Sequence, residues 1–206
     1  MIDRFKHIDL SNERVQRIIN HGFEEFSKQS YEKSSTNQIV KNAGVSRGLL
    51  YHYFKDKEEL YDFLIYYSIK IVMNELEKKI DWNNTDFLYR IRNVIILKLE
   101  IIENYPYLFE FHDKIDKKKI AKYSYEVEGE IPKFREKFYN YNLDFCNVKS
   151  GVDIDKMINV TRFVVKQIYT DYMERVFIEE TSINKEVLMK EIDIYLDFIR
   201  TSFYKN

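Results

Sequence analysis

The scarcity of turn-forming residues is the feature that most constrains the fold of this chain. Only five glycines and two prolines occur in 206 residues. A sandwich or barrel of many short strands needs a turn roughly every 8–12 residues. Apolar residues instead recur every three or four positions through most of the sequence, which is the spacing of one face of an α-helix. The sequence therefore predicts an all-α protein built largely from long helices.

The composition is that of a chain that packs around a core. Hydrophobic residues make up 45% of the sequence and charged residues 33%, which is typical of a packed protein and not of a disordered one. No charge-free run is longer than seven residues, whereas a helix that crosses a membrane needs about 20 apolar residues. The charged N-terminus is unlike a signal peptide. We therefore expect a cytoplasmic protein without a membrane segment.

The single cysteine, Cys146, excludes an internal disulfide bond and is typical of a reducing compartment. Cys146 lies in an aromatic stretch, where a lone cysteine most often serves as a small apolar residue. A role as a redox sensor is the alternative.

Capping residues divide the N-terminal region into three short helices and one long helix. Gly44 follows an apolar run, as a helix-ending glycine does, and Ser46 can cap the helix that follows. We expect helices from Ser11 or Asn12 onward, from Ser34 to about Asn42, from about Arg47 to Tyr53, and from Asp56 to about Ile80.

The remainder carries further helices with stronger apolar character. The segment 87–104 is apolar on most sides, which is typical of a central helix. Pro106 is expected to start a short helix, and residues 153–180 and 184–204 form two closing helices. Residues 113–150 show no clear pattern, with a break from Gly129 to Pro132. The expected organisation is a three-helix unit over residues 1–56 and a larger helical domain over residues 57–206.

The junction between the second and third helices has the helix-turn-helix pattern, in which two short helices flank a glycine-containing turn. Its motif residues are Ser46, Gly48, Leu50, Tyr51, Tyr53, Phe54, Asp56, Lys57, Glu58 and Leu60, preceded by Ile39, Ala43, Gly44 and Val45. On these residues, the segment from Ser34 to Leu60 closely resembles the N-terminal domain of the tetracycline-repressor (TetR/AcrR) family of bacterial transcription regulators. The resemblance implies a homodimer that binds a double-stranded, pseudo-palindromic DNA operator.

Several side chains of this segment are candidates for contacts to DNA phosphates: Ser34, Ser35, Gly48, Tyr51, Tyr53 and Lys57. Hydroxyl and free N–H groups at a helix start can receive a phosphate. A lysine in a first helical turn, such as Lys57, opposes the helix dipole unless an anion lies nearby. Gly48 costs its helix about 1 kcal/mol relative to alanine, either for tight helix packing or for close approach to DNA. For Tyr51, the alternative is a half-buried core position.

The candidates for contacts to DNA bases are Asn37, Arg47, Leu49 and His52. Arginine matches the paired acceptors of guanine, asparagine matches adenine, and leucine can contact the thymine methyl group. An ordinary exposed side chain would look the same in the sequence. The charge distribution agrees with DNA binding, because residues 1–57 carry a net charge of +3 although the whole chain carries −1.

The motifs of nucleotide-binding and hydrolytic enzymes are absent from the sequence. It has no glycine-rich phosphate loop and no nucleophile elbow, and its four histidines are not at metal-binding spacing. We therefore expect neither an enzyme nor a cofactor or metal. The run from Lys117 to Lys119 is a further candidate nucleic-acid contact. A solvated face is the simpler interpretation, because Asp113 and Asp116 dilute its charge.

The resemblance also implies that the second domain holds a cavity for a small organic effector. Candidate lining residues are Phe109, Phe163, Tyr169 and Lys166. The last two helices carry wide apolar stripes, which predicts burial against a second chain. Candidate residues of that dimer interface are Ile168, Tyr172, Leu188, Ile192, Tyr195 and Ile199. The prediction is a repressor that leaves its operator when the effector binds. The alternative is a DNA-bound scaffold that recruits a protein and has no effector.

Overall fold

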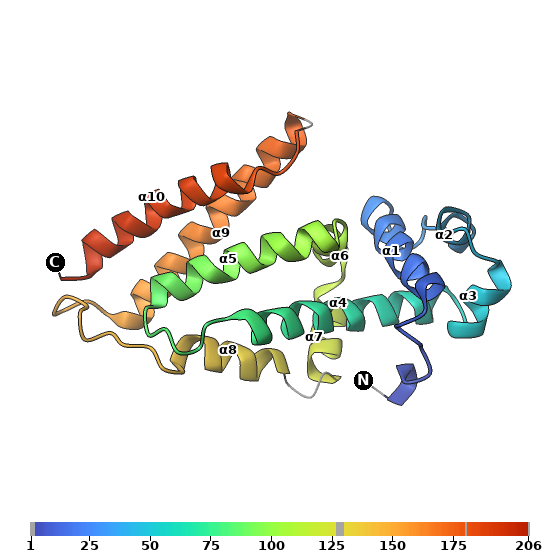
Figure 1. Ribbon diagram of the computed structural model, residues 1–206, viewed down its shortest axis with the longest axis horizontal. Helices are drawn as coiled ribbons and strands as arrows, with labels where there is room; N and C mark the ends of the chain where they lie inside the picture. The colour runs from blue at the N-terminus through green and yellow to red at the C-terminus, as the bar shows by residue number, and fades with distance from the viewer. Residues whose placement is uncertain (1–2, 127–129, 180, 206) are drawn as a thin grey trace. The chain divides into compact units, whose positions relative to one another are not determined.

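The computed structural model in Figure 1 describes residues 3–126, 130–179 and 181–205. These residues form ten α-helices and one short 3-10 helix, with no β-strand, which confirms the all-α prediction. The elements are η1 (Asp3–Phe5), α1 (Glu13–Lys28), α2 (Thr36–Ala43), α3 (Arg47–Tyr53), α4 (Lys57–Lys79), α5 (Phe87–Asn104), α6 (Leu108–Lys114), α7 (Lys117–Glu126), α8 (Glu130–Asn140), α9 (Ile154–Ile178) and α10 (Lys185–Phe203). None of the described helices has a stretch long and apolar enough to cross a bilayer.

Short polar side chains begin most of the N-terminal helices, as the sequence predicts. The Asn12 side chain accepts a hydrogen bond from the backbone N–H of Arg14, and Ser46 accepts one from that of Leu49. The second helix differs from the prediction by its first residue. The Ser34 hydroxyl donates to the Tyr31 carbonyl at 2.7 Å and completes the preceding turn, so Ser35 is the N-cap residue of α2.

The segment without a clear pattern, residues 113–150, contains all of α7 and α8. Asp116 accepts a hydrogen bond from the backbone N–H of Lys118 at 2.6 Å and starts α7. Pro132 lies in the first turn of α8, where its missing N–H is not needed, and Gly129 lies outside the described residues. Pro106 precedes α6 and does not start it, because Tyr107 is the N-cap residue.

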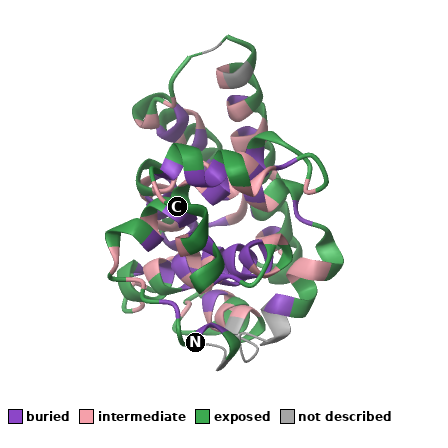
Figure 2. Ribbon diagram, turned by 90° about the vertical axis from the view of Figure 1, so that its right-hand side faces the viewer, coloured by how far each residue is buried: buried purple, intermediate pink, exposed green. Residues whose placement is uncertain are grey.

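The packing divides the chain into two compact units, which are described separately. The N-terminal unit consists of residues 1–78 and 100–137, and the C-terminal unit of residues 79–99 and 138–206. This division does not follow the predicted boundary after residue 56, which stays a prediction about function. The first three helices share one hydrophobic core with α4 and α6. Along the helices, buried positions alternate with exposed ones (Figure 2).

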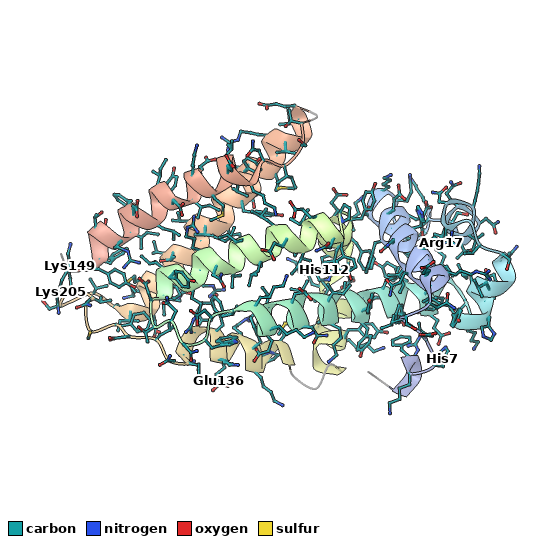
Figure 3. All side chains as sticks on the ribbon, viewed as in Figure 1. His7, Arg17, His112, Glu136, Lys149 and Lys205 are labelled. Atoms are coloured by element: carbon teal, nitrogen blue, oxygen red, sulfur yellow. The ribbon has the colours of Figure 1, made fainter. Side chains whose placement is uncertain are left out.

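The core of the N-terminal unit is aromatic where α1 meets α6. The ring centroids of Phe23 and Phe111 lie 5.3 Å apart. Beside them, Ser68 of α4 is fully buried, and its hydroxyl lies 2.6 Å from Nε2 of His112 on α6 (Figure 3). The Ser68 hydroxyl donates to the Ile65 carbonyl, so His112 Nε2 is the donor to Ser68. Burial lowers the pKa of His112 to about 4.

Three arginines link the segments of the C-terminal unit through hydrogen bonds and ion pairs. Arg90 of α5 is buried and donates to the carbonyls of Phe138, Tyr141 and Asn84 at 2.8–3.0 Å. Two ion pairs tie α10 to the start and middle of α5: Arg92 binds Asp193 through two hydrogen bonds, and Arg200 binds Asp86. Helices α9 and α10 lie side by side (Figure 1).

Candidate nucleic-acid interface

A tight turn holds α2 and α3 in a fixed relation at the end of the N-terminal unit. Gly44 ends α2 in the left-handed conformation, with φ of 61°, and the backbone N–H of Val45 donates to the Val40 carbonyl. A guanidinium nitrogen of Arg17, labelled on α1 in Figure 3, lies 3.8 Å from where a Cβ atom of residue 44 would stand. The buried residues Ile39, Ala43 and Leu50 anchor both helices.

The opposite face of α2 and α3 is open. Five of the predicted DNA-contact residues are exposed there, namely Asn37, Arg47, Gly48, Tyr51 and His52. Leu49 and Tyr53 are half-buried and pack against the core. Exposed Arg47 has no carboxylate within ion-pair distance among the residues that the structure describes. Its guanidinium contacts Tyr51, but five N–H donors are more than that contact uses, so donors remain for an outside acceptor.

Tyr51 connects the two helices of this face. Its hydroxyl lies 3.4 Å from the Thr36 hydroxyl at the start of α2, and the Arg47 guanidinium lies 5.3 Å from its ring centroid. The hydrogen bond with Thr36 lowers the pKa of Tyr51. Thr36 was not singled out from the sequence, although its place as the first residue of α2 is the signal that could have found it.

The surroundings of Gly48 bear on why a glycine stands in α3. A Cβ atom built on Gly48 would have the Ser46 hydroxyl oxygen as its nearest neighbour, at 4.0 Å. That is ordinary contact distance, so a side chain as large as that of alanine has room there. Packing within the protein therefore does not require the glycine.

Lys57 is the first residue of α4 and is half-buried. Its ammonium nitrogen lies 4.6 Å from the centroid of the Tyr31 ring, and in the described part of the chain no carboxylate forms an ion pair with it. Asp56 accepts a hydrogen bond from the Glu59 backbone N–H at 2.8 Å and so fixes the start of the helix. The Lys57 ammonium is thus held at a helix N-terminus without an ion pair in the described part of the chain, although its charge, after the larger effect of local hydrogen bonds, lowers the pKa of the nearby Glu32.

The two serines before α2 are more enclosed than the residues of α3. Ser34 is buried and its hydroxyl is bound to the Tyr31 carbonyl. Ser35 is half-buried, and its backbone N–H donates to the Glu25 carboxylate at 2.8 Å. The predicted phosphate contact of Ser34 is therefore not supported, because its hydroxyl proton is already donated, and the Ser35 hydroxyl is the group of this pair that a phosphate at the start of α2 could reach.

The predicted effector-pocket residues are spread over both units. Phe109 is half-buried at the core of the N-terminal unit. On α9 in the C-terminal unit, Tyr169 is half-buried, whereas Lys166 is exposed and Phe163 is 68% exposed. A groove of about 290 Å³ lies elsewhere in the C-terminal unit, between α5 and α10, with Ile96, Leu99 and Met189 among its lining residues.

The predicted dimer residues lie mostly inside a single chain. Five of them are buried: Ile168, Tyr172, Leu188, Ile192 and Ile199. Tyr195 is 45% exposed. Another apolar face of the same helices is open to solvent, and Val160, Phe163, Val187, Ile194 and Phe198 lie on it. The buried residues pack α9 and α10 within the chain. We call the five exposed residues together with Tyr195 the outer apolar face, and this face remains available for contact with a second chain.

Comparisons with known proteins agree on one family. Residues 18–63 match the family described as bacterial regulatory proteins, tetR family. A transcriptional regulator of the helix-turn-helix type from Staphylococcus aureus is 26% identical over 192 residues, which cover 91% of this chain and 95% of the relative.

Solved structures share the fold over nearly the whole length. A TetR family transcriptional regulator from Chloroflexus aurantiacus has a TM-score of 0.65 at 18% identity and covers 98% of this chain and 97% of its own. A ketosteroid transcriptional regulator of Mycobacterium tuberculosis has a TM-score of 0.63 at 15% identity, with 96% and 98% covered. Residues 18–63 thus match the N-terminal domain of the TetR family, and the described chain shares the fold of solved TetR family regulators.

Proposed function

We propose that this DNA-binding transcription regulator is a repressor that leaves its operator when a small organic effector binds. The observation that carries DNA binding is the open face of α2 and α3. It presents Arg47 and Tyr51 to solvent, with Lys57 at the start of the next helix, and among the described residues neither cation forms an ion pair with a carboxylate. Because α3 is anchored only through its other side, it is free to enter a major groove.

The residues of this face divide into two groups by what they contact on DNA. Tyr51 and Lys57 bind phosphates and set the position of the protein, as do Gly48 and the hydroxyl group of Ser35. Arg47, His52 and Asn37 read base edges, because their side chains stand on the exposed side of the two helices. The room around Gly48 supports this division, since a glycine that packing does not require fits the close approach of a backbone to DNA.

The active species is a homodimer joined through the outer apolar face of α9 and α10. Ile194 and Phe198 lie one turn apart on α10 and are 67% and 66% exposed. Two such helix pairs bury these side chains in a four-helix interface. The dimer then presents two recognition helices to half-sites about 34–36 Å apart, which is why the operator is a pseudo-palindrome.

The effector binds the helical domain and shifts the spacing of the two recognition helices. Its entry point in the C-terminal unit is the groove between α5 and α10, whose floor is apolar. The rim carries Lys185 and Lys190 against Glu186, while Arg92 and Asp193 are paired with each other. Such a groove suits an organic molecule with an apolar body and an acidic group. A 100-fold preference for the released spacing supplies about 2.7 kcal/mol of coupling. A scaffold without an effector is the competing function.

The phosphate role of Lys57 gives the sharpest test of DNA binding. Lys57→Ala should weaken binding to random-sequence and operator DNA alike, and the plot of log affinity against log salt should lose about one unit of slope. Lys133→Ala is the matched control, because it removes one positive charge from an exposed position of α8. Unchanged affinity and slope in Lys57→Ala would reject the phosphate contact.

The effector proposal needs a separate experiment. A thermal-shift screen of apolar organic acids should find a compound that stabilises the protein. The same compound should weaken operator binding by the factor by which operator DNA weakens binding of the compound. A compound that stabilises the protein without changing operator affinity is not the effector, and a screen in which no class of compound shifts the operator affinity favours the scaffold.

A further inference from the structure

The ring of Tyr31, in the turn between α1 and α2, contacts the ammonium groups of two lysines that come from different helices. The Lys57 ammonium lies 4.6 Å from the centroid of its ring and the Lys119 ammonium 5.6 Å. The ring itself is fixed by aromatic neighbours, since its centroid lies 4.9 Å from that of Tyr61 and 6.2 Å from that of Phe26, onto which it stacks. Tyr31 therefore gives the phosphate-binding lysine a rigid aromatic surface.

Lys119 comes from α7, outside the segment that resembles a DNA-binding domain. It is half-buried, and its ammonium lies 5.1 Å from the Tyr61 ring centroid and 3.5 Å from a carboxylate oxygen of Asp62. Buried Asp62 also binds Arg4 of the N-terminal segment at 3.3 Å. All these residues belong to the N-terminal unit. Lys119 is thus held from two sides and covers the ring on which Lys57 rests.

Both positive and negative groups surround Tyr31. We therefore expect Tyr31 to affect DNA binding through where it places the Lys57 ammonium, and not through net charge. Four carboxylates near the ring, those of Glu58, Asp56, Asp62 and Glu32, raise the pKa of Tyr31 after the larger effect of burial. These oppose the two lysines, and Asp62 offsets the charge of Lys119 directly. A gain in general positive potential therefore does not explain the arrangement.

A ring beneath an ammonium group orients the group without occupying its hydrogen-bond donors. A lysine ammonium has three N–H donors and a flexible four-carbon stem. Contact with the face of a tyrosine restricts where the ammonium stands, and the remaining donors stay available to phosphate oxygens. A Lys57 that is already held in place loses less freedom when DNA binds.

We propose that Tyr31 is a positioning residue for the phosphate contact of Lys57, and that Lys119 of α7 holds Tyr31 in place. The inference rests on the proposed DNA contact of Lys57 and extends it to two residues outside the helix-turn-helix. It also makes DNA affinity depend on a helix of the predicted effector domain, so that a displacement of α7 weakens a DNA contact directly.

The experiment is a double-mutant cycle on a labelled random-sequence duplex, because phosphate contacts do not require the operator. Tyr31→Leu should lower affinity about two- to five-fold, the size of an exposed cation–π contact, and make the salt dependence less steep. In a Lys57→Ala background it should change neither quantity. Tyr31→Phe keeps the ring and should bind like the unsubstituted protein.

Lys119 is tested with its neighbour as the matched control. Lys119→Met should weaken binding, whereas Lys118→Met removes an equal charge from an exposed position of the same helix and should not. Equal losses in both variants would mean that charge alone matters, and would overturn the inference. Tyr31→Leu losses that persist in the Lys57→Ala background, or Tyr31→Phe losses as large as those of Tyr31→Leu, would also overturn it.

The outcomes separate this inference from the proposed function. If Lys57→Ala binds DNA normally, the phosphate contact itself is wrong. If Lys57→Ala weakens binding and Tyr31→Leu does not, the contact stands and the positioning role fails. Thermal unfolding of each variant, measured beforehand, ensures that only folded protein is compared, and the salt slope is a readout that a loss of stability does not move.

Discussion

His112, a half-buried histidine of the N-terminal unit, predicts a specific dependence of stability on pH. His112 on α6 donates through Nε2 to the fully buried Ser68 hydroxyl on α4. The residue as a whole is half-buried, but its bonded nitrogen meets an oxygen that water does not reach. Burial therefore favours the neutral ring and lowers the pKa of His112 from 6.5 to about 4.

The magnitude follows from the two pKa values. Between about pH 6.5 and pH 4, the unfolded chain binds a proton at residue 112 that the folded chain does not bind, so stability falls as pH falls and becomes level below about pH 4. One pKa unit corresponds to about 1.4 kcal/mol. The full loss is therefore about 3 kcal/mol, and about 2 kcal/mol of it occurs between pH 7 and pH 5.

The assay is urea denaturation of the unsubstituted protein and of His112→Gln at pH 7, 6 and 5, at one protein concentration. Glutamine keeps an N–H donor for Ser68 but does not titrate. Between pH 7 and pH 5, the free energy of unfolding of His112→Gln should therefore fall by about 2 kcal/mol less than that of the unsubstituted protein. Ser68→Ala is the control. It should be less stable by about 1–3 kcal/mol at every pH, yet it should keep the pH dependence, because the ring stays buried. Parallel pH profiles for the unsubstituted protein and His112→Gln would refute the reasoning.

Three further predictions concern the other parts of the molecule. Arg47→Ala should lower operator affinity by about 1–3 kcal/mol and random-DNA affinity much less; titrations that show equal losses would reject base reading. Ile194→Asp should give a monomer in light scattering, since it places a charge on the outer apolar face, and a persistent dimer would assign the interface elsewhere. Arg90→Met should lower the free energy of unfolding by about 2–4 kcal/mol in urea denaturation, because three carbonyls lose their donor; the exposed Arg135→Met should cost almost nothing.

The order of the helices could be predicted because local signals in the sequence agree with the packing. Gly44 and Ser46 end one helix and start the next, and α3 and α5 have the bounds that the sequence predicts. Residues 113–150 gave no such signal, because α7 and α8 are short and lack a wide apolar face. A hydroxyl that bonds backward, as that of Ser34 does to Tyr31, also cannot be told from a helix cap by residue type alone.

In the candidate site, too, features that depend on local spacing can be predicted from the sequence, whereas contacts between distant side chains cannot. Sequence motifs singled out residues that lie together on the exposed face of α2 and α3, because their spacing is local; that they contact DNA stays a prediction. The two apolar stripes of α10 are a harder case, since Leu188 and Ile192 are buried while Ile194 and Phe198 are exposed. Both stripes are equally apolar, and only the placement of α9 decides which one faces inward. The contact of Lys119 with Tyr31 joins residues far apart in the chain, so no local pattern indicates it.

Because the space beside Gly48 is open, one substitution at this position is expected to raise stability and to weaken DNA binding. A glycine within a helix is less stable than alanine by roughly 0.5–1 kcal/mol, and α3 has room for the extra methyl group. Gly48→Ala should therefore raise the melting temperature of the free protein. In the DNA contact that we propose for Gly48, the same methyl group would stand between α3 and the DNA backbone. An engineering screen that selected only for heat resistance would favour Gly48→Ala, and the selected protein would bind its operator more weakly.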